Sequence, residues 1–166
     1  MIEIRAEQPS DIEAIREMNR QAFGQDDEGR IVDALRANGA AAVSLVATDG
    51  AAVVGHIMFS PLSVGSLAGI ALGPMAVAPD HQRQGIGSRL VHAGIERLRR
   101  AGCPFIVLIG HPAFYPRFGF EPAAKYGLTC EWDVPAEAFM VNVLDPQAAE
   151  KLNGAARYRA EFSAAA

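Results

Sequence analysis

Residues 74–100 read PMAVAPDHQRQGIGSRLVHAGIERLRR, and this stretch restricts the fold more than any other part of the chain. Its apolar beginning is typical of a strand and ends at Pro79, which has no backbone N–H to donate. A helical pattern begins at Gly85 and ends at Gly102. The apolar positions of this helix are Ile86, Leu90, Ala93 and Leu98. The next run, PFIVLIG, is continuously apolar, like a strand buried on both faces. The stretch therefore predicts a strand, a glycine loop, a helix and a second strand.

Apolar periodicity and turn signals predict the remaining elements. Strands are predicted at 2–6, 42–49, 51–64, 67–79, 138–144 and 156–162, and helices at 9–23, 26–39 and, briefly, 112–120. Ser10 and Glu13 have the spacing of a capping box at the start of the first helix, and Asp49-Gly50 marks a hairpin. This order predicts a mixed α/β fold around a central sheet. We expect one domain over residues 1–166, with a C-terminal extension from about residue 121 that packs on it.

Composition narrows the class of protein. Hydrophobic residues make up 50% of the 166 residues and charged residues 20%, which indicates a globular protein. The net charge of −4 gives no reason to expect nucleic acid or a membrane surface as a partner, and the arginines near residue 100 are typical of a solvated helix face. Cys103 and Cys130 have no metal-ligand spacing, so we expect no metal and a reduced intracellular protein, with a single disulfide as the alternative. No signal peptide or membrane span is predicted, which favours a soluble cytoplasmic protein.

Gly85 and Gly87 open the helix at a cost of about 1 kcal/mol each relative to alanine. They either allow a turn or a close approach, or they let backbone N–H groups reach a phosphate at the helix N-terminus. The dinucleotide pattern G-x-G-x-x-G fails at Leu90. The triphosphate pattern G-x-x-x-x-G-K-[ST] also fails, because the two lysines, Lys125 and Lys151, lie elsewhere.

A third motif fits. Residues 82–87, QRQGIG, match [QR]-x-x-G-x-[GA] after an apolar strand, and FYPRFGF matches Y-x-x-x-G-F with Tyr115 as its tyrosine. With both motifs in register, the chain resembles the GNAT family of acyl-CoA-dependent N-acetyltransferases over nearly its whole length. It looks most like a bacterial subgroup with GH(I/L)xFSP, FYxRFGF and (E/A)FMVxxL segments. The resemblance implies a mostly antiparallel, twisted central sheet, flanked by helices, whose middle strands splay apart.

The resemblance also implies acetyl-CoA as cosubstrate. The backbone N–H groups from Arg83 to Ser88 would surround the pyrophosphate, and the Arg83 and Ser88 side chains could add contacts. For Arg83 the alternative is a solvent-exposed arginine. The strand at Met75 to Val77 would pair with the pantetheine arm, and a backbone N–H there could polarise the thioester carbonyl. The implied cofactor-binding residues are Met75, Ala76, Val77, Gln82, Arg83, Gln84, Gly85, Ile86, Gly87 and Ser88.

Acetyl transfer needs an acid and a base. Tyr115 suits the general acid that protonates the leaving thiolate, and a core tyrosine among Phe114, Phe118 and Phe120 is its alternative. The candidate bases are Glu28, His56 and His111, and a chain of waters would serve equally well. One departure from the family pattern is Leu108, which stands seven residues before the tyrosine, where many members have asparagine.

The sequence thus predicts an N-acetyltransferase that transfers the acetyl group of acetyl-CoA to a primary amine of a small molecule or protein by direct attack. A non-catalytic acyl-CoA-binding sensor or interaction module is the alternative, and a third interpretation makes the glycines purely structural. The acceptor pocket is expected at residues 23–30 and after Phe120. The amine, the preferred acyl length and the oligomeric state are left open, with a homodimer as one possibility.

Overall fold

The structure of the chain is a computed structural model that describes residues 1–164. Contacts divide the chain into two compact units. The first unit contains Met1–Ser60, Gly73–Arg97 and the C-terminal segment from Ala160. The second unit contains Pro61–Leu72 and Leu98–Arg159. The prediction of one domain with an extension from about residue 121 stays a prediction.

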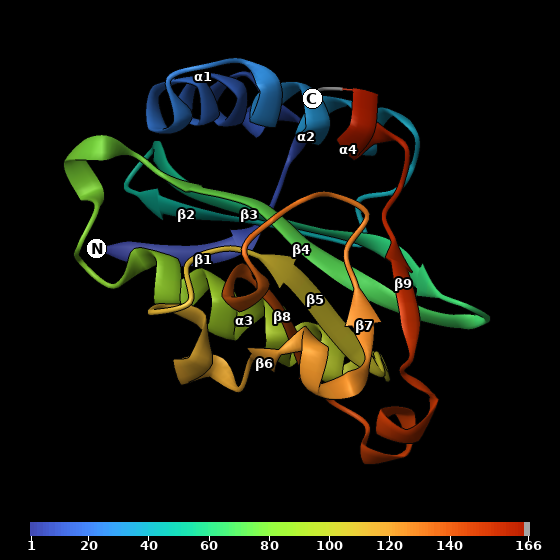
Figure 1. Ribbon diagram of the computed structural model, residues 1–166. Coiled ribbons are helices and arrows are strands. Elements are labelled where there is room, and N and C mark those ends of the chain that lie inside the picture. The colour runs from blue at the N-terminus through green and yellow to red at the C-terminus, as the bar shows by residue number, and fades with distance from the viewer. Residues whose placement is uncertain (165–166) are drawn as a thin grey trace. The chain divides into compact units, whose positions relative to one another are not determined.

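The first unit is built on antiparallel strands (Figure 1). β1 (Ile2–Ala6) pairs with β2 (Val43–Asp49), and β2 pairs with β3 (Ala52–Val64). The β2–β3 turn falls at Gly50, which confirms the predicted hairpin. The last part of β4 (Leu67–Val77), from Gly73 onward, also belongs to this unit.

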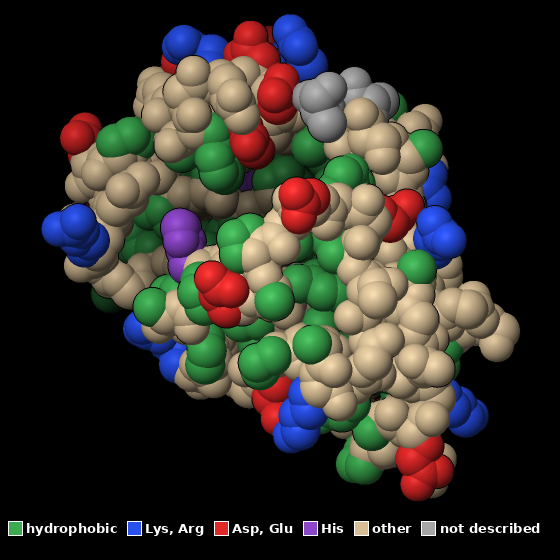
Figure 2. Space-filling model, in the orientation of Figure 1, with side chains coloured by type: hydrophobic (Ala, Val, Ile, Leu, Met, Phe, Trp, Pro, Cys, Tyr) green, Lys and Arg blue, Asp and Glu red, His purple; other side chains and the backbone are tan. Residues whose placement is uncertain are grey.

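Helices cover both faces of these strands (Figure 1). α1 (Ile12–Phe23) and α2 (Asp27–Ala37) lie on one face and α3 (Ile86–Arg100) on the other. Successive residues of β3 point to opposite faces, so Met58 packs under α1 and α2 while Phe59 faces α3. The core under α1 and α2 consists of Ile15, Val32, Leu35, Ala40, Val46 and Met58. Figure 2 shows charged side chains of both signs on the outer surface of α1 and α2, at the top of the view.

The second unit has a sheet in the order β4-β5-β8-β6. β5 (Phe105–Ile109) runs parallel to the first part of β4, with Ile70 opposite Ile106 and Ala71 opposite Val107. The other strands of the unit are β6 (Glu121–Pro122), β7 (Leu128–Thr129), β8 (Phe139–Val143) and β9 (Gly154–Arg157). β8 pairs antiparallel with β5 and β6, and β9 pairs parallel with β7 and antiparallel with the end of β3. Their shared core includes Leu62, Val64, Ala71, Phe105, Val107, Phe139 and Val141.

These pairings confirm the predicted mixed α/β fold with a mostly antiparallel sheet and flanking helices. The predicted splay of the middle strands stays a prediction. Short 3₁₀ helices fill many connections: Pro9–Asp11, Pro79–His81, Tyr115–Phe118, Ala123–Tyr126, Ala136–Ala138 and Pro146–Lys151. Cys103 and Cys130 are both free thiols, so the disulfide alternative was wrong. Among the described helices, none is both long and apolar enough to cross a membrane.

Three local predictions were wrong. The capping box is formed by Gln8 and Asp11, not by Ser10 and Glu13, because the chain enters α1 through the 3₁₀ turn Pro9–Asp11, whose N-cap is Gln8. The stretch predicted as a short helix at 112–120 contains only a 3₁₀ turn, which Gly119 ends at φ 97°. The late strand predicted at 156–162 is not one strand: β9 ends at Arg157, and the short helix α4 (Glu161–Ala164) begins before the stretch ends.

Candidate functional site

The glycine loop between β4 and α3 has an unusual backbone. Arg83 and Gly85 both lie in the left-handed region, at φ 64° and φ 81°. A Cβ atom on Gly85 would have no heavy atom within 4 Å, so close packing does not explain this glycine. A left-handed residue followed by a right-handed one turns adjacent N–H groups to the same side, as in anion-binding nests. Glycine at position 85 therefore allows the left-handed backbone conformation, and it leaves open space beside the chain.

The helix that follows adds donors to this loop. The N–H of Arg89 donates to the Gly85 carbonyl at 3.1 Å, which makes Gly85 the residue that caps α3. By helix geometry, the N–H groups of Ile86, Gly87 and Ser88 then have no carbonyl within the helix to bind. They lie at the positive end of the helix dipole, where an anion is stabilised. The loop and the first turn of α3 together can bind a phosphate group.

Side chains within the loop fix its shape. The Gln82 side-chain amide donates to the Val77 carbonyl at 3.0 Å, and the Gln84 amide donates to the Asp80 carbonyl at 3.4 Å. On β4, Ala76 is buried, whereas Met75 and Val77 are half-buried. The ten predicted cofactor-binding residues thus all lie within one continuous segment of the first unit, Gly73–Arg97.

The second unit holds Tyr115, at the first position of its 3₁₀ turn. Its side chain is 7% exposed, and burial raises the pKa of Tyr115 to about 12. Ring centroids of three phenylalanines lie 4.9 to 6.3 Å from the tyrosine ring: Phe114, Phe118 and Phe120. Among the described residues, none forms a hydrogen bond with the hydroxyl. Tyr115 is therefore a packed aromatic residue that keeps its proton at neutral pH.

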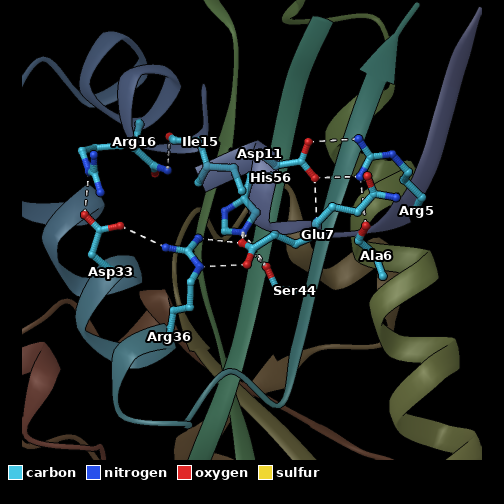
Figure 3. Close-up of polar contacts among 12 residues, drawn as sticks. Arg5, Ala6, Glu7, Asp11, Ile15, Arg16, Asp33, Arg36, Ser44 and His56 are labelled. Atoms are coloured by element: carbon cyan, nitrogen blue, oxygen red, sulfur yellow. Dashed lines mark hydrogen bonds and ion pairs between the residues drawn. The ribbon is translucent and has the colours of Figure 1, made fainter. Parts of the chain in front are cut away.

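His56 lies in a partly buried polar cluster of the first unit, which we call the Glu7 cluster: Glu7, Arg36, Ser44 and His56 (Figure 3). The imidazole is 0% exposed, and its Nε2 lies 2.8 Å from Ser44 Oγ and 3.5 Å from Glu7 Oε1. Ser44 Oγ donates to Glu7 Oε1 at 2.8 Å, so Nε2 carries the proton that Ser44 accepts. His56 Nδ1 is buried without a hydrogen-bond partner among the described residues.

Charge sets the protonation of the Glu7 cluster. Arg36 binds both carboxylate oxygens of Glu7, at 2.6 and 2.8 Å. Burial alone would raise the pKa of Glu7, but the hydrogen bonds from Arg36, His56 and Ser44 hold it well below its usual range. Burial lowers the pKa of His56, and the neighbouring Glu7 carboxylate only partly offsets this effect. The cluster therefore contains an ionised carboxylate and a neutral imidazole at neutral pH.

The other candidate bases have different surroundings. Glu28 lies in the first turn of α2, half-buried, and both its carboxylate oxygens accept from Gln25 Nε2 at 3.1 Å. His111 is exposed, and its carbonyl accepts from the N–H of Phe114 at 3.1 Å, within the turn that carries Tyr115. Among the candidate bases, the Glu28 carboxylate is therefore accessible, whereas the His56 imidazole is enclosed.

Two residues, one in β5 and one in β8, refine the sequence interpretation. Leu108, at the position where the family often has asparagine, is 1% exposed and lies in β5 opposite Met140. Sequence reasoning missed Asn142 on β8, whose side-chain amide donates to the Phe118 carbonyl at 3.0 Å. A single polar residue inside the apolar run FMVNVL was the only signal that could have marked it. Within residues 1–164, no three His, Cys, Asp or Glu side chains gather where they could hold a metal ion.

Comparisons with known proteins agree with this geometry. The acetyltransferase (GNAT) family profile matches residues 11–120. Uncharacterized N-acetyltransferase YhbS of Escherichia coli K12 is 36% identical over 163 residues, covering 96% of this chain and 98% of that protein. Uncharacterized N-acetyltransferase YjhQ of the same strain is 38% identical over 135 residues, covering 77% of this chain and 75% of that protein.

Two solved structures extend the similarity. The crystal structure of YhbS from Escherichia coli in complex with CoA has a TM-score of 0.93 at 35% identity, covering 98% of this chain and 92% of that one. A GNAT family acetyltransferase from Brucella melitensis in complex with acetyl-CoA has a TM-score of 0.83 at 36% identity, covering 98% of both chains. With the family profile matched across the glycine loop and Tyr115, and with relatives aligned over nearly the whole length, this chain belongs to the GNAT family of acetyltransferases.

Proposed function

We propose that this protein is an N-acetyltransferase that transfers the acetyl group of acetyl-CoA to a primary amine of a small molecule or protein. The observation that carries the proposal is the loop at Arg83–Ser88, with its left-handed residues and the first-turn N–H groups of α3, which have no acceptor within the helix. The names of its relatives and the CoA and acetyl-CoA in their crystal structures support it.

The loop fits the pyrophosphate of coenzyme A. The N–H groups of Ile86, Gly87 and Ser88 would donate to phosphate oxygens, and the bare Cα atoms of Gly85 and Gly87 would let them approach. The Arg83 guanidinium and the Ser88 hydroxyl would add side-chain contacts. Met75 to Val77 would pair with the amide groups of the pantetheine arm. When bound, acetyl-CoA supplies a thioester whose carbonyl carbon is open to attack by an amine.

In the reaction, a bond forms between the amine nitrogen and the carbonyl carbon, and the C–S bond breaks. A thiol has a pKa of about 8.5, so it is a stronger acid than Tyr115, whose pKa burial raises to about 12. We therefore expect the Tyr115 hydroxyl to stabilise the leaving thiolate mainly as a hydrogen-bond donor. Water would then supply the proton that completes the thiol.

The base must accept a proton from the attacking amine. Glu28 is accessible to such a proton, whereas the enclosed His56 would need a water to connect it. Replacing Glu28 with Gln and His56 with Gln, and measuring kcat against pH, distinguishes the two. The base is the residue whose replacement removes the fall of kcat at acidic pH. If this fall is unchanged in both variants, water accepts the proton from the amine.

A non-catalytic acyl-CoA sensor is the second candidate, favoured by Leu108 at the family's asparagine position and by the burial of Tyr115. Thiol release from acetyl-CoA over a panel of small amines and amine-bearing peptides tests the two. We expect turnover by the wild type and a loss of about 10²-fold in Tyr115→Phe. Tight binding of acetyl-CoA without turnover on any amine would instead support the sensor.

Binding of coenzyme A tests the loop separately. Gly85→Val places a β-branched residue at φ 81° and a side chain in the open space, so we expect at least a tenfold loss of affinity by calorimetry. Gly50→Val, at φ 61° in the β2–β3 turn, is the matched control for strain outside the loop. Equal affinity in wild type and folded Gly85→Val would rule out the loop as the phosphate site.

A further inference from the structure

Gly110 lies directly after β5, against the ring of Tyr115. A Cβ atom at this position would come 2.5 Å from Cε2 and 3.1 Å from Cδ2 of the tyrosine. Contacts under 3.0 Å essentially never occur for real Cβ atoms, so something would have to shift. The φ of Gly110 is not in the left-handed region, so the backbone does not require glycine there. The space that a side chain would take is the space that the tyrosine ring occupies.

The backbone around Gly110 has little freedom to move away. Its N–H donates to the Ala138 carbonyl at 2.9 Å, immediately beyond the pairing of Ile109 with Phe139. A methyl group at 110 would also lie 3.4 Å from Leu108 Cδ1. Because these contacts hold the strand end, the ring would have to yield.

The tyrosine ring is also confined by its aromatic neighbours. Phe114 packs edge-on to it at 4.9 Å, and Phe120 lies 5.9 Å away. The turn that carries Tyr115 is fixed by Asn142, which binds the Phe118 carbonyl. A ring pushed from the Gly110 side therefore cannot keep its position by a small sideways adjustment, and its hydroxyl would point elsewhere.

We propose that Gly110 is a positioning residue for the reaction: its missing side chain sets the place and direction of the Tyr115 hydroxyl. This inference rests on the proposed function, in which that hydroxyl stabilises the leaving thiolate. Gly110 touches neither acetyl-CoA nor the amine in this role and acts only through the tyrosine.

Gly69 offers a matched control in the same unit. It is buried, its φ is not in the left-handed region, and an added Cβ would come 2.4 Å from Cζ of Phe105. Gly69→Ala therefore introduces a similar overlap with an aromatic ring, but that ring carries no hydroxyl. If overpacking alone lowers kcat, both variants should show the loss. If the loss arises from a displaced Tyr115, only Gly110→Ala should show it.

Kinetics with saturating amine test the inference. We expect Gly110→Ala to lower kcat about 10²-fold, as for displaced catalytic groups, with the KM for acetyl-CoA changed less than about twofold. Gly69→Ala should keep kcat within about threefold of the wild type. In the Tyr115→Phe background, Gly110→Ala should cost less than about threefold more, because the hydroxyl is already gone. A wild-type kcat in Gly110→Ala, or losses that multiply fully in the double variant, would overturn the proposal.

A measurement independent of turnover separates this inference from the proposed function. The chain has three tyrosines, so ring-labelled tyrosine gives three NMR signals. Gly110→Ala should shift the Tyr115 signal and leave those of Tyr126 and Tyr158 in place, even if Tyr115→Phe turns over normally. An unmoved Tyr115 signal would contradict the positioning role whatever the kinetics show.

If Gly110→Ala folds too poorly for kinetics, its thermal unfolding still tests the inference. Gly110→Ala should lower Tm by about 5 °C through overpacking. In Tyr115→Ala no ring remains to collide, so adding Gly110→Ala should shift Tm by less than about 2 °C. An equal drop in both backgrounds would show that Gly110 is needed for something other than the ring.

Discussion

The Glu7 cluster and the aromatic residues around Tyr115 each bury a group capable of proton transfer, but they hold it by opposite means. His56 is held by hydrogen bonds, with Ser44 at 2.8 Å and a carboxylate fixed by Arg36 behind it. Tyr115 is held by shape, between three phenylalanine rings and the bare Cα of Gly110, with no hydrogen bond to its hydroxyl among the described residues. The first environment should therefore respond to charge and pH, and the second to volume.

Volume should matter most at Phe120, which is 3% exposed and lies beside Tyr115. Phe120→Ala leaves a cavity and should lower the free energy of unfolding by about 3–5 kcal/mol in urea titrations. Phe120→Leu keeps more of the volume and should cost clearly less. Equal losses in the two variants would mean that shape does not govern this region.

Charge should matter next at Glu7. Glu7→Ala removes both carboxylate oxygens that the mostly buried Arg36 guanidinium binds and the acceptor of the Ser44 hydroxyl. Among the described residues it leaves Arg36 only Asp33 as a partner, and should cost about 3 kcal/mol of unfolding free energy. Glu17→Ala on α1 removes an exposed partner of Arg20 and should leave the urea midpoint nearly unchanged. If Glu7→Ala behaves like Glu17→Ala, the cluster does not stabilise the unit.

The two regions should also differ in their pH dependence. Burial lowers the pKa of His56 below 6.5, so as pH falls below 6.5 the unfolded chain binds a proton that the folded chain does not. Stability should then fall by at most about 1.4 kcal/mol per pH unit for this group. The lowered pKa of Glu7 adds a loss below about pH 4.5.

Tyr115 should affect the pH dependence of the free energy of unfolding only at alkaline pH. Because burial raises its pKa to about 12, its contribution is complete below pH 10 and is lost between about pH 10 and 12. Unfolding measured from pH 4 to 11 in the wild type, His56→Gln and Tyr115→Phe tests the contrast. His56→Gln should flatten the slope between pH 6.5 and 4.5, and Tyr115→Phe should reduce only the alkaline slope. A slope between pH 6.5 and 4.5 that survives His56→Gln would contradict the contrast.

The smallest effect is expected at Ser44. Ser44→Ala removes the hydroxyl that joins His56 to Glu7 and should cost about 1 kcal/mol, because the imidazole still has the carboxylate 3.5 Å away. Ser44→Thr keeps the hydroxyl and is the control. A loss in Ser44→Ala as large as that in Glu7→Ala would make the hydroxyl, rather than the charge, the centre of the cluster.

The sequence allowed the local elements to be predicted where a short pattern determines them. The helix after Gly85, the hairpin at Asp49-Gly50 and the buried β5 all follow from periodicity or turn chemistry within a few residues. The turn at Tyr115 was misjudged as a helix because its end depends on the left-handed Gly119 and on Asn142, which lies more than twenty residues later. Local propensity does not contain that contact.

The two buried environments could not have been predicted in the same way. Glu7 directly follows β1, Arg36 lies in α2 and His56 lies in β3, so they meet only when these elements are packed together. The role of Gly110 is equally hidden, since a glycine after a strand usually signals a turn. Motif spacing located the loop and the tyrosine, whereas the partners that tune His56 and Tyr115 depend on tertiary structure.

The left-handed Arg83 has a consequence for engineering. A residue with a side chain at φ 64° is strained by about 1 kcal/mol relative to glycine, so the loop keeps an arginine against its own conformational preference. A library screened only for heat resistance should therefore accumulate glycine or asparagine at position 83. A library screened for retention on an immobilised coenzyme A resin should keep arginine, and sequencing position 83 from the two selections would reveal which demand the natural residue satisfies.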